Sequence, residues 1–175
     1  MDDPKKAEAI GIAATGKLKD LKYKDALNLF NQAIKESFEF CGNNPFFFSR
    51  RGECYLNLGF YKEALEDIRK ACEISQQAYF KFQLCSAYFS SGQYEVALEN
   101  INCFLPELKN DEAYLRGGYF LLQAAIYHKL GDLDQVYAFL EKAAEHNIDD
   151  INVLQYEELY DDVSEDERFI SLFDA

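Results

Sequence analysis

The chain has 175 residues, 49% of them apolar, and a formal net charge of −13. This length suits one domain, and the apolar fraction predicts a buried core rather than disorder. The negative charge argues against nucleic-acid phosphate or anionic lipid as the main binding partner. The acids concentrate at the C-terminus, where residues 149–175 hold ten acids and one base.

The N-terminal residues show neither a leader nor an anchor pattern. Met1–Lys6 lead directly into helical periodicity, and no stretch has the ~20 uninterrupted apolar residues of a membrane span. The five cysteines are odd in number and form no Cys-x-x-Cys motif. We therefore expect reduced thiols in the cytoplasm, with no membrane insertion and no disulfide scaffold.

Residues 7–40 are predicted to form the first of four helix pairs. In each pair a small residue opens the second helix, a turn residue stands five positions before it, and apolar residues after it keep one helix face apolar. Ala26 is the small residue here, and Leu21 stands at the turn. The second helix is expected to run on past Phe38 and to end at Cys41 and Gly42.

The second and third pairs, residues 45–77 and 78–108, repeat the pattern most clearly. Ala64 and Ala97 open the second helices, and glycine stands at both turns. Between the first two pairs, Asn44 followed by proline predicts a helix cap and a first helical turn.

The fourth pair, residues 112–146, aligns on Val136 and carries Gly117-Gly118 inside its first helix. Each glycine there costs up to ~1 kcal/mol relative to alanine, so close helix packing is expected at this point. Residues 149–175 are predicted to be acidic capping helices, one over residues 151–163 and another after the capping box Ser164–Glu167. The alternative is a mobile acidic arm that recruits a basic partner or competes with a ligand.

This repeated pattern resembles the tetratricopeptide repeat (TPR) over about residues 7–146, with departures in the first and fourth pairs. The match is most specific at Tyr55, Leu58, Gly59, Tyr61 and Ala64 and at Tyr88, Gly92, Tyr94 and Ala97. The resemblance implies an all-α fold, a right-handed superhelix of about four helix-turn-helix pairs with a C-terminal capping helical segment. Residues 1–148 would form the superhelix and residues 149–175 the cap.

Motifs for catalysis are absent from the sequence. It contains no His-Glu-x-x-His, no phosphate-binding loop and no Gly-x-Gly-x-x-Gly, and its two histidines have no partner at metal-ligand spacing. We therefore predict a protein that is not an enzyme and that needs no metal or cofactor.

In the resembling family the first helix of each pair lines a concave groove. The first repeat would supply Glu8, Gly11, Ile12, Thr15, Leu18 and Lys19. From the later repeats, the candidate peptide-binding residues are Phe46, Arg50, Glu53, Asn57, Tyr79, Phe82, Gln83, Phe89, Leu122, His128 and Lys129. The positions of the chaperone-type carboxylate clamp hold Gly11, Thr15, Arg50, Tyr79 and Gln83, so we expect no such clamp.

The resemblance therefore implies a protein-interaction adaptor or scaffold, co-chaperone-like, that binds a peptide segment of a protein partner through apolar anchors. One alternative is a chaperone for a secreted protein, similar to the TPR chaperones of type III secretion. Another assigns many of these aromatic residues to the core between helices. Self-association is also open, since apolar grooves and end faces can pair.

Overall fold

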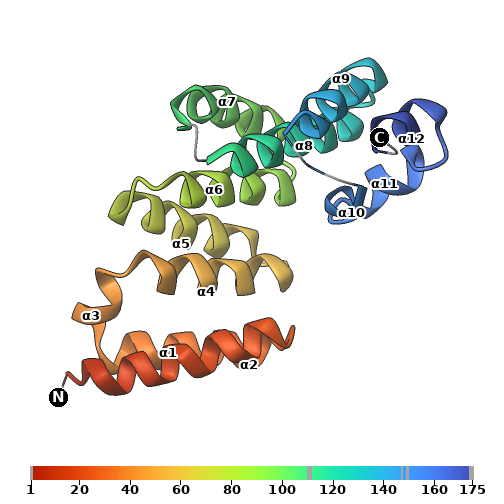
Figure 1. The fold of residues 1–175 in the computed structure, drawn as a ribbon. Coiled ribbons are helices and arrows are strands. Elements are labelled where there is room, and N and C mark those ends of the chain that lie inside the picture. Colours follow the sequence, from red (N-terminus) through yellow and green to blue (C-terminus); the bar gives the residue numbers. More distant parts are fainter. Residues whose placement is uncertain (1, 110–111, 147, 149, 174–175) are drawn as a thin grey trace. The chain divides into compact units, whose positions relative to one another are not determined.

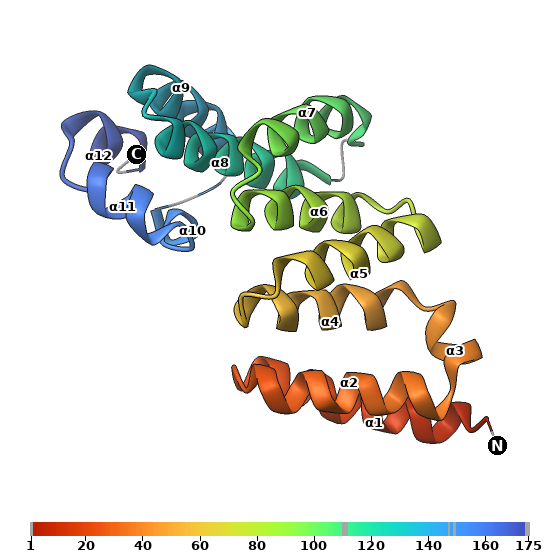
Figure 2. The ribbon, with the colours of Figure 1, turned by 180° about the vertical axis from the view of Figure 1, so that it is seen from behind.

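The computed structural model describes residues 2–109, 112–146, 148 and 150–173, and all regular structure in these ranges is helical (Figures 1 and 2). The first six helices are α1 (Pro4–Lys19), α2 (Tyr23–Glu36), α3 (Phe38–Gly42), α4 (Pro45–Asn57), α5 (Tyr61–Ile74) and α6 (Ala78–Ser90). They are followed by α7 (Tyr94–Phe104), the 3₁₀ helix η1 (Leu105–Glu107), α8 (Ala113–Leu130), α9 (Leu133–Ala144), α10 (Asp150–Val153), α11 (Glu157–Val163) and α12 (Glu167–Phe173). The predicted all-α class is confirmed. Within the described residues, no helix combines the length and the apolar character that crossing a bilayer requires.

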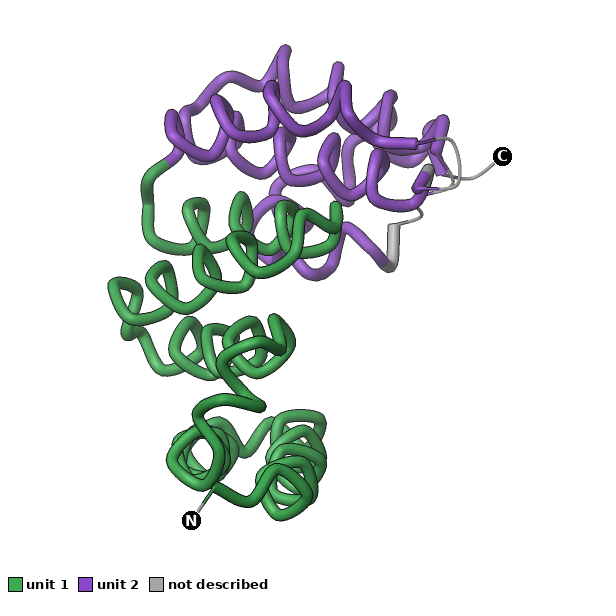
Figure 3. Tube along the Cα trace, turned by 90° about the vertical axis from the view of Figure 1, so that its left-hand side faces the viewer, with its two compact units in different colours: residues 1–93 green, residues 94–175 purple. Residues whose placement is uncertain are grey.

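The chain divides into two compact units, Met1–Gln93 and Tyr94–Ala175 (Figure 3). The division falls between the two helices of the third predicted repeat, and the division of the sequence after residue 148 remains a prediction. The units differ in charge. Unit 1 contains 13 bases and 12 acids, whereas unit 2 contains 5 bases and 19 acids.

In unit 1, α1 lies against α2 and α4 lies against α5 as antiparallel pairs (Figures 1 and 2). Ala26 and Ala64, the small residues that open the second helices, are fully buried. Gly52 on α4 allows the second pair to close, because a Cβ atom there would lie 2.6 Å from Cγ1 of Ile68. The predicted small-residue contact is therefore present.

The turns between paired helices use the left-handed backbone region. Gly59, Gly92 and Gly131 have φ values of +78°, +73° and +77°. Leu21 occupies the same place in the first pair with φ +58°. A leucine is sterically strained in this region, since its Cβ crowds the carbonyl oxygen, so the first turn differs from the others in energy and not in geometry.

The second helix of the first pair does not run on past Phe38 as expected. It ends at Glu36 because Ser37 adopts an extended conformation with φ −146° and ψ +95°. The Ser37 backbone N–H donates to the Ala33 carbonyl, and its buried hydroxyl accepts from the N–H of Phe40 at 3.3 Å. The extra residues of the first repeat thus form the separate short helix α3.

A partly buried ion pair joins the helices of the second pair. Arg51 on α4 donates from Nε and Nη2 to the two carboxylate oxygens of Asp67 on α5, each at 2.7 Å. A third bond runs from Arg51 Nη1 to Asn31 on α2 at 3.0 Å. The guanidinium therefore connects three helices of unit 1.

In unit 2, α8 packs against α9 and the C-terminal helices lie beside them (Figures 1 and 2). Gly117 on α8 permits a close approach, because a Cβ there would lie 2.5 Å from Cγ1 of Ile148. Packing therefore explains the first glycine of the Gly117-Gly118 pair, but against residues that follow α9 and not, as expected, against a helix.

The C-terminal segment forms helices that bury Val153, Leu159, Val163 and Phe169, whereas Leu154 and Ile170 are exposed. The guanidinium of Arg168 lies 3.7 Å from the Tyr137 ring centroid. This packing favours the cap over the mobile arm, although the cap's role remains a prediction.

Two details of the C-terminal segment differ from expectation. The helix expected over residues 151–163 is divided into α10 and α11, and the Ile151 side chain lies outside the described residues. Asp166, not Ser164, caps α12, because its Oδ1 accepts from the N–H of Arg168 at 2.8 Å.

Candidate functional site

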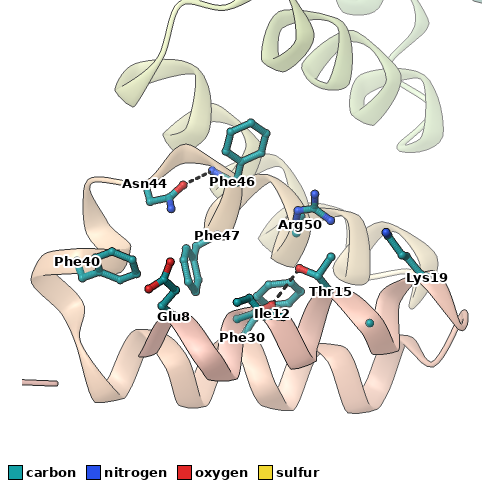
Figure 4. A pocket seen from close by; sticks show the side chains of 12 residues that line it. Glu8, Ile12, Thr15, Lys19, Phe30, Phe40, Asn44, Phe46, Phe47 and Arg50 are labelled. Atoms are coloured by element: carbon teal, nitrogen blue, oxygen red, sulfur yellow. Dashed lines mark hydrogen bonds between the residues drawn. The ribbon is translucent and has the colours of Figure 1, made fainter. Parts of the chain in front are cut away.

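A pocket of about 470 Å³ lies between α1 and α4 in unit 1, on the side that the first helices present (Figure 4). It is lined by Glu8, Gly11, Ile12, Thr15, Gly16, Lys19, Phe30, Phe40, Asn44, Phe46, Phe47 and Arg50. Phe46 and Arg50 belong to the predicted groove set, and Glu8, Gly11, Ile12, Thr15 and Lys19 stand at groove positions of the first repeat. The five remaining residues were not expected to line a groove.

The floor of the pocket is aromatic and well packed. The Phe47 ring, 7% exposed, makes edge contacts with Phe30 and Phe40 at centroid distances of 6.2 and 6.0 Å. Gly11 on α1 makes room for this ring, because a Cβ there would lie 2.6 Å from Phe47 Cζ. The position of Phe47 therefore depends on glycine at residue 11.

The end wall of the pocket is provided by the irregular step between the first two repeats. Phe40 belongs to α3, which exists because Ser37 interrupts the preceding helix. Asn44 then starts α4, its Oδ1 accepting from the N–H of Phe46 at 3.1 Å. A repeat of regular length would have no residues to build this wall.

The mouth of the pocket exposes apolar surface. Ile12 on α1 is 69% exposed and Phe46 on α4 is 45% exposed. Phe46 also contacts the buried Phe80 ring at 5.1 Å and the exposed Tyr79 ring at 6.3 Å, so the apolar surface continues onto α6 at Tyr79. Large apolar side chains exposed together on one surface are typical of binding sites.

Charged groups are unevenly placed around the pocket. Glu8 lies toward the Phe40 end and Lys19 toward the other, while Arg50 projects from α4 (Figure 4). Among the described residues, neither Lys19 nor Arg50 forms an ion pair or a side-chain hydrogen bond. Burial raises the pKa of the nearby Glu53 carboxyl, and the Arg50 charge opposes this shift.

A polar chain links α4 to α6 next to the aromatic residues. The buried Ser49 hydroxyl donates to Oε1 of Gln83, and Gln83 Nε2 donates to the Tyr79 hydroxyl at 2.9 Å. Gln83, predicted as a polar contact for a ligand, therefore uses its amide to position Tyr79.

The other predicted groove residues of unit 1 lie further along α4 and α6. Glu53 is partly buried, and the exposed Asn57 donates its amide to the Glu53 carbonyl at 2.9 Å. Phe82 and Phe89 are partly buried on α6. None of these four residues lines the pocket between α1 and α4.

In unit 2 the predicted groove residues were expected to be free to bind a ligand, but the structure buries or pairs them. Leu122 is fully buried, so it belongs to the core and we remove it from the candidate surface. His128 Nε2 lies 2.6 Å from Asp162 Oδ2, and the ammonium of Lys129 pairs with Glu158. Both acids come from α11, so the two bases are engaged by the C-terminal helices.

The pocket residues that were missed are Gly16, Phe30, Phe40, Asn44 and Phe47. Phe30 lies on a second helix and Phe40 in the added segment, neither of which a regular repeat sends to the groove. The available signal that the first two repeats are joined differently was the spacing of 38 residues from Ala26 to Ala64, against 33 from Ala64 to Ala97. Within the described residues, no group of three His, Cys, Asp or Glu side chains could hold a metal ion.

Comparisons with known proteins support this architecture. The tetratricopeptide repeat model matches residues 48–77. The chain is 36% identical over 59 residues to the translocon at the outer membrane of chloroplasts 64 of Pisum sativum, a match that covers 34% of this chain and 9% of that protein. The chain thus spans under a tenth of the curated relatives that it matches.

Solved structures extend the likeness over most of the chain. TTC0263, a thermophilic TPR protein of Thermus thermophilus, is 19% identical with a TM-score of 0.70, covering 95% of this chain and 87% of that one. YrrB, a TPR protein with an unusual peptide-binding site, is 20% identical with a TM-score of 0.66, covering 87% and 74%. With its helix pairs, glycine turns and buried small residues, the chain has a tetratricopeptide repeat fold, and residues 48–77 match the repeat model itself.

Proposed function

We propose that this chain is a non-enzymatic adaptor that binds a peptide segment of a protein partner in the pocket between α1 and α4. The TPR fold is a protein-interaction fold, and YrrB, a TPR protein of similar fold, has a peptide-binding site. The observation that carries the proposal is the pocket itself, whose lining includes residues at predicted groove positions on α1 and α4, the first helices of the first two pairs.

The shape and composition of the pocket favour a peptide over a folded surface. Its volume of about 470 Å³ is within the range of roughly 300–1,000 Å³ typical of sites for small ligands and side chains. Exposed apolar residues at the mouth would contact the flanking peptide backbone. A chaperone-type carboxylate clamp is not part of this proposal, because the corresponding positions in unit 1 hold Gly11, Thr15, Tyr79 and Gln83 beside Arg50. A cytoplasmic location remains a prediction that rests on the five free cysteines.

Selection of displayed random peptides on the full chain tests the proposal. We expect selected peptides to lose at least about tenfold in affinity for Ile12→Asp, because a charge at the mouth opposes burial of an apolar anchor. Leu133→Asp is the matched control, since Leu133 is also exposed, on α9, and is absent from the pocket. Equal binding to wild type and Ile12→Asp would contradict the proposed site.

A further inference from the structure

We infer that the pocket between α1 and α4 takes one bulky apolar side chain of a peptide that carries a carboxylate close to that anchor, paired with Arg50. The inference rests on the proposed function and adds the chemistry of the partner segment. The carboxylate could belong to an acidic side chain or to a free C-terminus, and the experiment below separates these sources.

The aromatic floor calls for an apolar anchor. The Phe47 ring is held between Phe30 and Phe40, and Gly11 leaves no polar side chain above it. Two nearby polar atoms are already used: the Thr15 hydroxyl donates to the Gly11 carbonyl at 2.9 Å, and Asn44 Oδ1 accepts from the N–H of Phe46. A polar side chain entering this floor would lose its water without gaining partners.

The charge arrangement calls for an acid on one side of that anchor. Arg50 is a planar donor suited to carboxylates, and the apolar surroundings strengthen such a pair. Lys19 adds a second positive charge at the same end of the site, away from Glu8 (Figure 4). Glu8 disfavours an acid at the Phe40 end and so fixes the direction in which the peptide lies.

A comparison with the bases at the end of α8 supports this assignment, and one of them, Lys129, stands at the repeat position of Lys19. His128 and Lys129 are already paired with acids of α11. Arg50 and Lys19 have no acidic partner within hydrogen-bonding distance among the described residues. Glu53 on the same helix attracts Arg50 electrostatically but forms no ion pair with it among the described residues, so a ligand carboxylate can pair with Arg50 directly.

Gly16 provides a way to close the pocket without disturbing the core. It lines the pocket on α1, and a Cβ atom there would meet nothing within 4 Å. Gly16→Phe should therefore fill the cavity while the helix is retained. Gly16→Ala is the matched control, because it keeps the helix and adds only one methyl group.

The experiment measures fluorescence anisotropy of labelled peptides with the full chain. Each peptide has a Gly/Ser background, one Phe, and one Glu at zero to three residues from it, with both ends blocked. Matched peptides replace Phe by Ala, Glu by Gln, or Glu by Lys. A further peptide has Gln in place of Glu and a free C-terminal carboxylate next to the Phe.

We expect at least one Phe–Glu spacing to bind wild type and Gly16→Ala about equally. Gly16→Phe should weaken that binding at least about tenfold, and Arg50→Ala should weaken it about tenfold for the acidic peptide. The Gln peptide should be insensitive to Arg50→Ala. Tighter Arg50-dependent binding of the free-carboxylate peptide than of the Phe–Glu peptides would assign the C-terminus as the source, and weaker binding would assign an acidic side chain.

Two results would overturn the inference in different ways. The carboxylate part of the inference is wrong if Phe–Glu and Phe–Gln peptides bind equally, or if Arg50→Ala reduces the affinity of both by the same factor. The peptide site itself still stands in that case if Gly16→Phe blocks binding. If neither these peptides nor the selected ones are affected by Gly16→Phe, the proposed function falls with the inference. Circular dichroism melts of each variant verify that the fold is retained.

Discussion

Leu21 is a single residue that the fold holds in an unfavourable conformation. Its φ of +58° is occupied by glycine in the other turns, and its side chain is exposed and gains little from packing. A non-glycine residue pays roughly 1–2 kcal/mol of steric strain in the left-handed region. Glycine avoids this strain, but its greater conformational freedom stabilises the unfolded chain and offsets part of the gain.

We therefore predict that Leu21→Gly raises the free energy of unfolding by about 0.5–1 kcal/mol, measured by urea denaturation. Leu21→Ala is the control, because it removes the side chain and keeps the strain. A similar gain in both variants would attribute the effect to loss of the exposed leucine.

Glu53 is the second residue whose surroundings predict a measurable effect. Burial raises its pKa in the folded state, and the Arg50 charge opposes this. Between its ordinary pKa and the raised one, the folded chain binds more protons than the unfolded chain, so stability falls as pH increases through this range. Above it the destabilisation is fully present.

Glu53→Gln should accordingly raise the urea midpoint at pH near 7 and have little effect below the ordinary pKa of Glu, about 4.3. Urea unfolding of wild type and variant at both pH values provides the measurement. A variant that is less stable than wild type at neutral pH would mean that attraction to Arg50 outweighs burial.

At the scale of elements, the helix pairs depend on where glycine stands. Gly52 lies at the contact of α4 with α5, whereas Gly16 faces open space on α1. We predict that Gly52→Ala destabilises the chain by about 1–3 kcal/mol through overpacking against Ile68. Gly16→Ala should stabilise it by about 1 kcal/mol through helix propensity.

Thermal and urea unfolding of the two alanine variants check this opposite pair. Because the substitution is the same, helix propensity alone would give both variants the same sign. A gain in both would mean that α4 and α5 separate easily to admit the methyl group.

The Arg51–Asp67 pair connects elements through charge. Asp67→Ala would leave the Arg51 guanidinium partly buried with only its bond to Asn31, so we expect a loss of about 3 kcal/mol. Replacing both by apolar residues, Arg51→Met with Asp67→Leu, should recover much of that loss. A double-mutant cycle measured by urea unfolding gives the coupling free energy between Arg51 and Asp67. Additive effects of the two substitutions would contradict the predicted coupling.

At the scale of the whole molecule, the net negative charge comes from unit 2 alone, with 19 acids against 5 bases. Like charges at this density repel one another and destabilise the compact state. Salt screens this repulsion, with a Debye length that falls from about 30 Å at 0.01 M to about 8 Å at 0.15 M.

We predict that the thermal midpoint rises when potassium chloride is increased from about 0.01 M to about 0.15 M. Chloride is used because sulfate would stabilise through exclusion from the surface. A midpoint that falls instead would show that pairs such as His128–Asp162 contribute more than the repulsion does.

The sequence alone determined the helical class, the order of the paired helices and the places of their turns. These follow from local rules: a 3.6-residue apolar period, small residues such as Ala64 where helices touch, and glycine such as Gly59 where the backbone turns left-handed. It also located Asn44 as a cap and Gly117 as a packing point, because each acts through neighbours close by in the sequence or through a single packing contact.

Only the tertiary structure decided which apolar residues are core and which line a site. Leu122 and Phe46 both stand at groove positions of the pattern, yet one is fully buried and the other borders the pocket. The break at Ser37, which builds the pocket wall, and the pairing of His128 with Asp162 were decided there too. The physical reason is that the exposure and the pairing of a side chain depend on which distant segments of the chain pack over it. A local sequence pattern does not specify those long-range contacts.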